Sequence, residues 1–207
     1  MFIFSRQRTI DPARAGEAMS GATAITGVVK EASGMDVTAW YSQFAPTGPG
    51  ITWTARLEHL EDLDVAFTEL MASSDYLDAT AELDESFTGP VVDSMVQLIA
   101  GTPPKTATPM TSVVQATAMP GHLRAAMHWG ADVAERVGRS LDTPMIFGRS
   151  LFGAYGSMIW GAYYEDANDL EGTQAKFGAD EMLQAVVDEG GHNCQPGAFS
   201  VVMRQLG

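Results

Sequence analysis

The sequence contains a single cysteine, Cys194, among its 207 residues. A lone thiol cannot form an internal disulfide and suits a reducing compartment, so we expect a cytoplasmic protein. Long hydrophobic runs are missing too, because charged residues, glycine or proline interrupt every apolar stretch well short of the roughly 20 residues that span a bilayer. Residues 2–8 place apolar side chains before charged ones, which is typical of a first strand and not of a secretory signal. The sequence therefore predicts no membrane partner.

Basic residues are scarce as well. The chain has 12 Lys and Arg against 26 Asp and Glu, which gives a formal net charge of -14. This charge repels phosphate backbones, so we predict no nucleic-acid partner. The Gly-x-Ser-x-Gly, P-loop and Gly-x-Gly-x-x-Gly motifs are also missing, and with them the usual signals of hydrolases and of nucleotide-binding proteins.

The four histidines are too scattered to indicate a metal site. His122 and His128 lie six positions apart on one predicted helix, which places them on different faces instead of at the chelating i, i+4 spacing. His192 and Cys194 are close in sequence, but they lie in a glycine-rich loop without a second pair of ligands. We predict no metal and no cofactor.

The two halves of the chain repeat each other. A segment at residues 101–110, rich in proline and threonine, separates residues 1–100 from residues 111–207 and predicts a linker between two domains. An ungapped shift of 107 positions pairs identical residues on either side of it: Trp53 with Trp160, Ala55 with Ala162, Glu58 with Glu165, Asp62 with Asp169, Leu63 with Leu170 and Ala72 with Ala179. The same shift pairs Trp40 with Phe147. We infer an internal duplication.

Hydrophobic periodicity predicts the same order of elements in each half. In the first half we expect a strand at 2–8, a helix that begins after Asp11 and ends at Gly34, strands at 37–45 and 51–58 joined by a turn at 46–50, a helix from about 61, and a strand at 91–99. In the second half we expect strands at 112–118, 145–151, 157–165 and 198–204, and helices at 120–137 and 168–187. Both orders read βαββαβ.

A βαββαβ unit covers one face of its sheet with helices and leaves the other face bare, so we expect the two sheets to pack together. The predicted fold is α+β, with two ferredoxin-like βαββαβ units that form an intramolecular α+β barrel. The sequence resembles the dimeric α+β barrel superfamily, which includes small monooxygenases and isomerases, haem-degrading and chlorite-dismutase-like enzymes, and NIPSNAP-like proteins. Three segments carry this resemblance: residues 53–58, 60–63 and 70–76. Such a duplicated chain is expected to be a monomer that acts as a pseudo-dimer, or a weak homodimer.

Alternation along the strand at 51–58 divides its side chains between two faces. The apolar set, Ile51, Trp53, Ala55 and Leu57, is expected to meet the helices, and Thr54 and Arg56 belong to the polar set that would point between the sheets. Arg56 and Tyr163 could together orient an organic anion, with Trp40 and Trp53 stacking on an aromatic ligand. Alternatively the polar face is solvated, Arg56 pairs with Glu58 or Asp93, and the tryptophans belong to the core. Arg6 and Arg8 leave the same two readings open.

Two histidines are candidates for chemistry, His59 and His128. His59 is the best single candidate for proton transfer, because its pKa lies near neutrality; the alternative is a surface histidine at the start of a helix. Haem is implied only by the resemblance, with His128 as an axial ligand, and an exposed helical histidine is the alternative.

The sequence leaves two functions open. In the first, a small aromatic or organic-acid ligand is bound or transformed between the sheets, as in cofactor-independent monooxygenases or isomerases. In the second, the chain is a non-catalytic stress or interaction module of the NIPSNAP-like kind. The first function is that of an enzyme or a binding protein and the second is not catalytic, and both are compatible with the fold because fold does not fix function.

Overall fold

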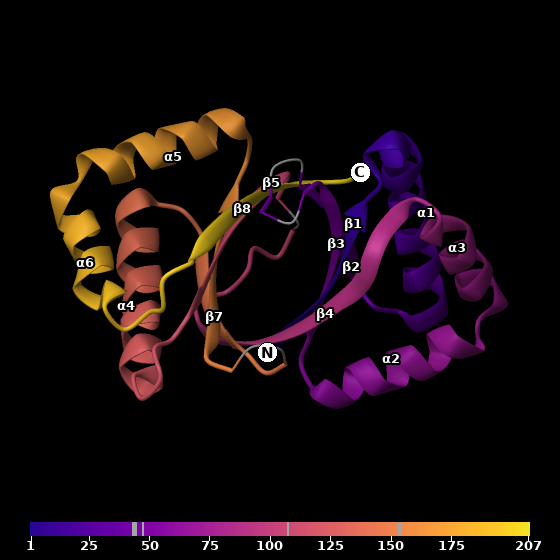
Figure 1. Cartoon of the computed structure of the whole chain (residues 1–207), viewed down its shortest axis with the longest axis horizontal. Coiled ribbons are helices and arrows are strands. Elements are labelled where there is room, and N and C mark those ends of the chain that lie inside the picture. The colour runs from indigo at the N-terminus through magenta and orange to yellow at the C-terminus, as the bar shows by residue number, and fades with distance from the viewer. Residues whose placement is uncertain (43–44, 47, 107, 153–154) are drawn as a thin grey trace. The chain divides into compact units, whose positions relative to one another are not determined.

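The computed structural model describes residues 1–207 except 43, 44, 47, 107, 153 and 154. Parts of the predicted strand at 37–45, the turn at 46–50 and the linker at 101–110 therefore lie outside the described residues. The chain divides into two compact units: residues 1–95 with 204–207, and residues 96–203. Figure 1 labels the elements along the chain.

The first unit follows the predicted βαββαβ order. Its elements are β1 (Phe2–Ile10), a 3-10 turn (Pro12–Arg14), α1 (Ala15–Ser33), β2 (Val37–Ser42), β3 (Gly50–Leu57), α2 (Leu60–Ala72), α3 (Ser74–Asp84) and β4 (Phe87–Ala100), whose last residues belong to the second unit. Asp11 caps the 3-10 turn by accepting a hydrogen bond from the Ala13 amide. Gly34 ends α1 with φ 67°, a left-handed conformation that costs glycine no strain.

The second predicted helix of this unit is in fact two helices. Ser73 has extended backbone angles, and its side chain accepts a hydrogen bond from the Tyr76 amide, so it closes α2 and caps α3. A serine hydroxyl can accept a hydrogen bond from a free backbone amide in the first turn of a helix, so serine is favoured at helix starts over helix interiors. The break turns α3 back against α1.

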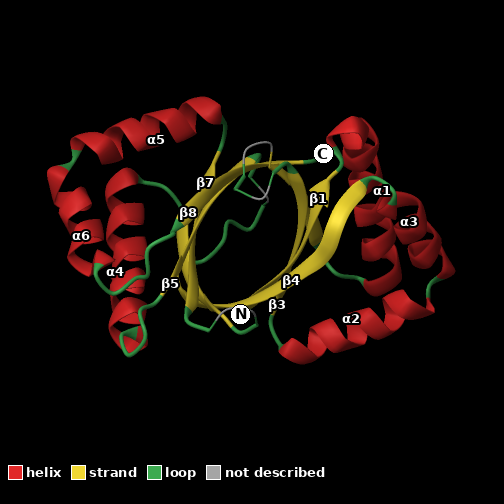
Figure 2. Ribbon diagram, in the orientation of Figure 1, coloured by secondary structure: helices red, strands yellow, loops and turns green. Residues whose placement is uncertain are grey.

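The side chains of the first unit's sheet are divided between its two faces, as the alternation along 51–58 predicts. β3 lies between β1 and β2, and both pairings are antiparallel. Ile51 and Trp53 pack in the cores formed with the helices, as predicted for these two residues. Figure 2 shows α1, α2 and α3 together on one face of these strands. Trp40 and Thr54 belong to the other face, where the Trp40 indole donates a 2.8 Å hydrogen bond to the Thr54 hydroxyl.

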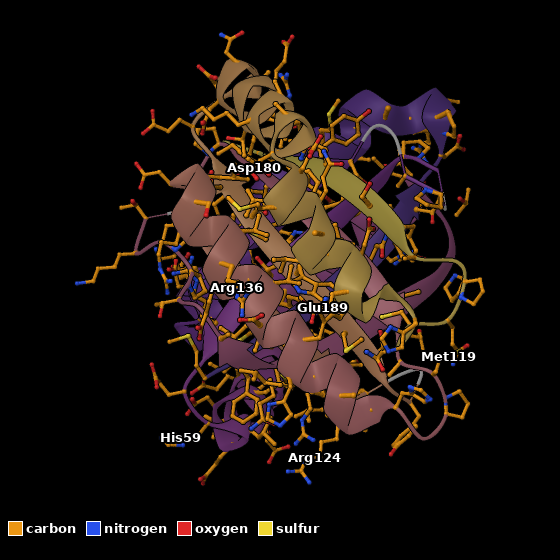
Figure 3. The ribbon with its side chains drawn as sticks, turned by 90° about the vertical axis from the view of Figure 1, so that its left-hand side faces the viewer. His59, Met119, Arg124, Arg136, Asp180 and Glu189 are labelled. Carbon is orange, nitrogen blue, oxygen red and sulfur yellow. The ribbon has the colours of Figure 1, made fainter. Side chains whose placement is uncertain are left out.

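The second unit repeats this plan. Its elements are β5 (Met110–Thr117), α4 (Leu123–Leu141), β6 (Met145–Ser150), β7 (Ser157–Tyr164), α5 (Ala167–Ala179), α6 (Glu181–Gly191) and β8 (Phe199–Gln205), whose last residues belong to the first unit. β7 lies between β5 and β6 in antiparallel pairings. On the exposed side of α4, Arg136 pairs with Asp132 one turn earlier at 2.7 Å (Figure 3).

The prediction of a single helix at 168–187 is also wrong, because two helices lie there, as in the first unit. The break lies at Asp180, whose carboxylate accepts hydrogen bonds from the amides of Met182 at 3.0 Å and Leu183 at 3.1 Å (Figure 3). An aspartate at this place is a strong helix start, so two short helices satisfy more amides than one long helix would.

One equivalence drawn from the ungapped alignment is corrected by the strand register. Trp53 faces Ala39 across the β2–β3 pair, and Trp160 faces Phe147 across the β6–β7 pair. The counterpart of Phe147 is therefore Ala39 and not Trp40. A shift of one residue within a strand moves a side chain to the other face of the sheet, so this difference reverses the surroundings of the residue.

The tryptophans themselves are true counterparts. The Trp53 indole donates to the Ala22 carbonyl of α1 at 3.4 Å, and the Trp160 indole donates to the Gly130 carbonyl of α4 at 2.9 Å. In both units the central strand is thus tied to the first helix by the same contact.

Across the chain, hydrogen-bonded neighbours follow the order β1-β3-β2-β8-β5-β7-β6-β4, the strand order of a closed α+β barrel. The predicted fold class is confirmed. Among the described helices, none is both long and apolar enough to cross a bilayer.

Candidate functional site

A pocket of about 110 Å³ lies within the first unit, between its sheet and its helices. Residues from all four strands and all three helices of the unit line it, and most of them are apolar or aromatic. The aromatic members are Phe4, Trp53, Phe67, Tyr76 and Phe87. Small-molecule sites are typically concave and apolar with a few polar groups, and this pocket has that composition.

Two pairs of aromatic rings meet edge to face around the pocket. Phe4 and Phe67 lie 5.7 Å apart between ring centroids at 88°, and Trp53 and Phe87 lie 5.9 Å apart at 73°. Such contacts hold the rings in fixed orientations. The walls are therefore largely shaped before any ligand arrives.

Arg6 supplies the first polar group and is held by protein partners. Its Nε and Nη2 donate to the two carboxylate oxygens of Asp93, each at 2.8 Å, and its guanidinium lies 5.3 Å from the centre of the Phe67 ring. The hydrogen bond to Asp93 is the main cause of a pKa of Arg6 raised above its ordinary value. Because of this two-point pairing, most hydrogen-bond donors of Arg6 are already used by protein partners.

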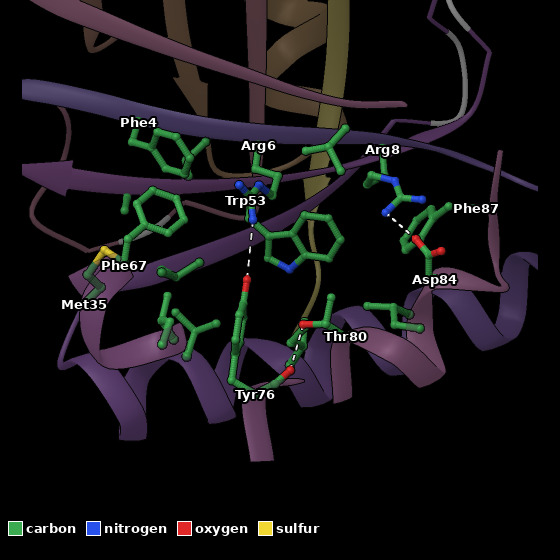
Figure 4. A pocket seen from close by; sticks show the side chains of 18 residues that line it. Phe4, Arg6, Arg8, Met35, Trp53, Phe67, Tyr76, Thr80, Asp84 and Phe87 are labelled. Carbon is green, nitrogen blue, oxygen red and sulfur yellow. Dashed lines mark hydrogen bonds and ion pairs between the residues drawn. The ribbon is translucent and has the colours of Figure 1, made fainter. Parts of the chain in front are cut away.

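Tyr76 stands beside Arg6 and is positioned by the start of α3. Its amide is held by the Ser73 cap, its ring is buried, and its hydroxyl accepts a 3.4 Å hydrogen bond from Arg6 Nη1. Figure 4 shows Tyr76 rising from α3 with its hydroxyl group directed at Arg6. One turn further along α3, the Thr80 hydroxyl donates to the Tyr76 carbonyl at 2.7 Å and brings a second hydroxyl to the pocket wall.

Arg8 supplies the second polar group and is less completely held. Its Nη1 lies 2.8 Å from an oxygen of Asp84, and its guanidinium lies 4.8 Å from the centre of the Phe87 ring (Figure 4). The Arg8 side chain is 12% exposed, whereas that of Asp84 is 64% exposed. Within the part of the chain that the structure describes, Arg8 Nε is buried and has no hydrogen-bond partner. A buried donor without a partner is costly, so this atom is a natural point of attachment for a ligand.

The residues predicted from the sequence fall into two groups. Trp53 and its neighbour Thr54 both belong to the lining of this pocket, although the Thr54 hydroxyl accepts a hydrogen bond from Trp40 on the other face of the sheet. Trp40 lies on the opposite face of the sheet, and Arg56 is exposed on β3. Tyr163 belongs to β7 of the second unit and is half-buried. The site formed by Thr54, Arg56 and Tyr163 between the sheets remains a prediction.

The two histidines that we singled out are both exposed. His59 begins α2, and its backbone amide donates to the Asp62 carboxylate at 2.8 Å. His128 lies on α4. Neither residue lines the pocket. In the described part of the chain, no group of three or more His, Cys, Asp or Glu side chains could hold a metal ion.

The sequence contained part of the signal for this pocket. Phe4, Arg6, Arg8 and Ile10 occupy every second position of β1 and therefore share one face of the strand. Two charged residues thus lie on the face that meets the helices. Their partners could not be found in the same way, because Asp93 and Asp84 lie far away in the sequence. Tyr76 was noted only for its place in a family-like segment.

Comparison with known proteins supports the fold. No protein-family model and no curated protein matches the chain. Solved structures do match it, and the following three are among those that cover the whole chain. A Fusobacterium nucleatum protein provisionally described as a monooxygenase is 9% identical, with a TM-score of 0.75, and 92% of its chain is covered. An anthrone oxidase-like protein is 14% identical, with a TM-score of 0.69 and 91% of its chain covered. A Lactobacillus acidophilus protein, also provisionally described as a monooxygenase, is 11% identical, with a TM-score of 0.69 and 94% of its chain covered.

At these identities the likeness establishes the fold and not the activity. The predicted fold is confirmed: the chain has the fold of these three proteins over its whole length.

Proposed function

We propose that the first unit binds a small aromatic compound in the pocket between its sheet and its helices, and oxidises it with molecular oxygen without a cofactor. The observation that carries this proposal is the pocket itself, with aromatic walls and two guanidinium groups in one wall. The similarity in fold to proteins described as monooxygenases and as anthrone oxidase-like favours this class of reaction over others.

The chemistry suits the residues present. A phenol or an anthrone that loses a proton becomes an electron-rich anion, which can itself reduce oxygen. In the net reaction a ring CH or CH₂ group becomes a carbonyl, one oxygen atom enters the product and the other leaves as water, so that the substrate supplies all the electrons. A guanidinium in an apolar surrounding stabilises the anion far more than water-exposed charge would. Arg8 lies in such surroundings, because its side chain is 12% exposed and its guanidinium lies 4.8 Å from the centre of the Phe87 ring.

Oxygen uptake with 1-naphthol and with anthrone tests the proposal. We expect uptake above the spontaneous rate, with one water and one quinone formed per oxygen consumed. Uptake at the spontaneous rate with both compounds, together with no binding of either, would refute the proposal and favour the non-catalytic interaction module.

Two neighbouring residues on β4 provide a matched pair of variants. Val91 lines the pocket and is 45% exposed, whereas Val92 is 54% exposed and does not line it. Val91→Trp places a large ring at the edge of the pocket at little cost to the fold and should reduce both binding and oxygen uptake. Val92→Trp adds the same bulk on the other side of the strand and should leave both unchanged. Equal effects of the two variants would place the site elsewhere.

A further inference from the structure

The two arginines of the pocket differ in what they can offer to a ligand. Arg6 already forms a two-point pair with Asp93, with both contacts at 2.8 Å, and also contacts Tyr76. Nη1 of Arg8 lies 2.8 Å from one oxygen of Asp84, and Nε is not paired with this carboxylate. A second carboxylate could reach Arg6 only by displacing a strong two-point partner, so Arg8 is the better anion receptor.

The partner of Arg8 is also the easier one to replace. Asp84 is the last residue of α3, and its side chain is 64% exposed. The carboxylate is therefore already largely solvated and can rotate towards the solvent at little cost. Arg8 is 12% exposed, and its Nε has no partner within the described residues. If the Asp84 carboxylate turns away, the buried Arg8 guanidinium is left without a counter-ion, which is costly. The anionic group of a ligand can take the place of Asp84 and offset this cost.

The second unit lacks this arrangement. Arg6 and Arg8 face Trp53 and Ile51 across the β1–β3 pair. At the matching positions of β5, Val114 faces Trp160 and Ala116 faces Met158. The same fold thus carries two guanidinium groups in one copy and apolar side chains in the other.

We propose, building on the function above, that the ligand of the first unit is an aromatic monoanion whose charged group binds Arg8, and that Asp84 occupies this place in the free protein. Side-on binding of a carboxylate or phenolate satisfies Nε, and Asp84 turns to the solvent. One anion binds per chain, because the second unit offers no guanidinium at the matching strand positions.

Calorimetric titration with two matched pairs of probes tests this inference: benzoate against benzamide, and 2-naphthoate against 2-naphthamide. Each pair has the same ring and nearly the same shape, and only the carboxylate is charged at neutral pH. A charge-assisted hydrogen bond in a buried site implies that the acid binds about tenfold more tightly than its amide, with one site per chain.

Three variants locate the charge. Arg8→Met keeps the length of the side chain and should abolish the preference for the acid while leaving amide binding in place. Arg14→Met is the control, because Arg14 pairs with Glu85 next to Asp84 but does not line the pocket. Asp84→Asn removes the internal competitor and should tighten acid binding several-fold with no effect on the amide. A purely structural ion pair would make Asp84→Asn weaken both probes or neither.

The outcomes separate this inference from the proposed function. If acids and amides bind equally well to the parent protein, or if Asp84→Asn does not favour the acid, the assignment to Arg8 is wrong while the aromatic pocket stands. Two acid sites per chain would also overturn it. If no probe of either pair binds, the assignment to Arg8 fails, and oxygen uptake with 1-naphthol and anthrone decides the proposed function separately.

Discussion

Replacement of Gly130 by alanine should destabilise the protein, although the same change usually stabilises a helix. Gly130 lies inside α4 and is buried against two rings of the second unit. An added methyl carbon would lie 2.3 Å and 2.4 Å from ring atoms of Phe147 and 3.0 Å from Trp160. Carbon atoms pack at about 3.5–4.0 Å, so at least one element must move.

Neither ring can move away easily. Phe147 is fully buried, and its ring lies 5.0 Å from that of Trp160 between centroids. Trp160 is fixed further by its hydrogen bond to the Gly130 carbonyl and by the edge of Trp129 at 5.4 Å. Overpacking of a well-filled core costs about 1–3 kcal/mol, and this site belongs at the upper end of that range. The helix gains about 1 kcal/mol from alanine, so the net loss is about 2 kcal/mol.

Thermal unfolding followed by circular dichroism measures the effect. A loss of about 2 kcal/mol lowers the melting temperature by roughly 4–8 °C in a chain of this size. Gly27→Ala is the control: Gly27 is an exposed residue within α1, an added methyl would meet nothing within 4 Å, and the variant should melt about 2–4 °C higher. A Gly130→Ala variant that melts with or above the parent protein would refute the packing argument.

Three further predictions concern single side chains. Asp180→Ala removes the cap of α6 and should cost about 1 kcal/mol in thermal unfolding, whereas Asp188→Ala within the same helix should be nearly neutral. Burial raises the pKa of the Cys194 thiol, so less thiolate is present at pH 8 and iodoacetamide should react more slowly with the folded protein than with the protein in urea; equal rates would contradict this. Asp93→Asn should lower the melting temperature by roughly 2–4 °C, since the pair is only partly buried and contributes about 1 kcal/mol. Asp93 raises the pKa of Arg6 in the folded protein. The stability that this cation contributes is therefore fully present below the pKa of Arg6 in the unfolded chain, and it is lost only as pH rises through the pKa of Arg6 in the folded protein. A loss of the Asp93→Asn effect at pH 8 would contradict this.

The sequence predicted the elements well where a local rule decides them. The alternation along 51–58 fixed which side chains of β3 meet the helices, because a one-residue slip would have buried Thr54 and Arg56 in place of Trp53. Gly34 ended α1 because few other residues adopt a left-handed backbone without strain.

The helix breaks at Ser73 and Asp180 could not be predicted from periodicity alone. Both residues are good caps, but serine and aspartate inside a helix cost only a few tenths of a kcal/mol. Whether the chain turns at such a residue depends on what the following segment can pack against. Here α3 packs on α1 and α6 packs on α4, and those contacts decide the outcome.

The pocket was harder still to predict. Alternation shows which residues share a face, but the empty volume between a sheet and its helices depends on the sizes of side chains that come from distant segments. The pairing of Arg6 with Asp93 and of Arg8 with Asp84 joins β1 to residues 87 and 76 positions away, and no local pattern encodes such distances. The sequence therefore favoured the polar face of β3, where the visible polar residues lie, over the apolar face that contains the pocket.

The presence of two units with the same plan explains how such a pocket can persist. An arginine with an unpartnered buried Nε costs a unit about 1–3 kcal/mol, and each βαββαβ unit has only one helix-facing core to absorb that cost. In the second unit the register positions of the two arginines are Val114 and Ala116, and Phe147, Trp129 and Trp160 pack together behind them. The two copies share the tryptophan contact to the first helix but differ in what fills the space beside it. The second unit thus supplies apolar packing at the positions where the first unit has its two guanidinium groups, so the cost of the buried charge falls on one unit only.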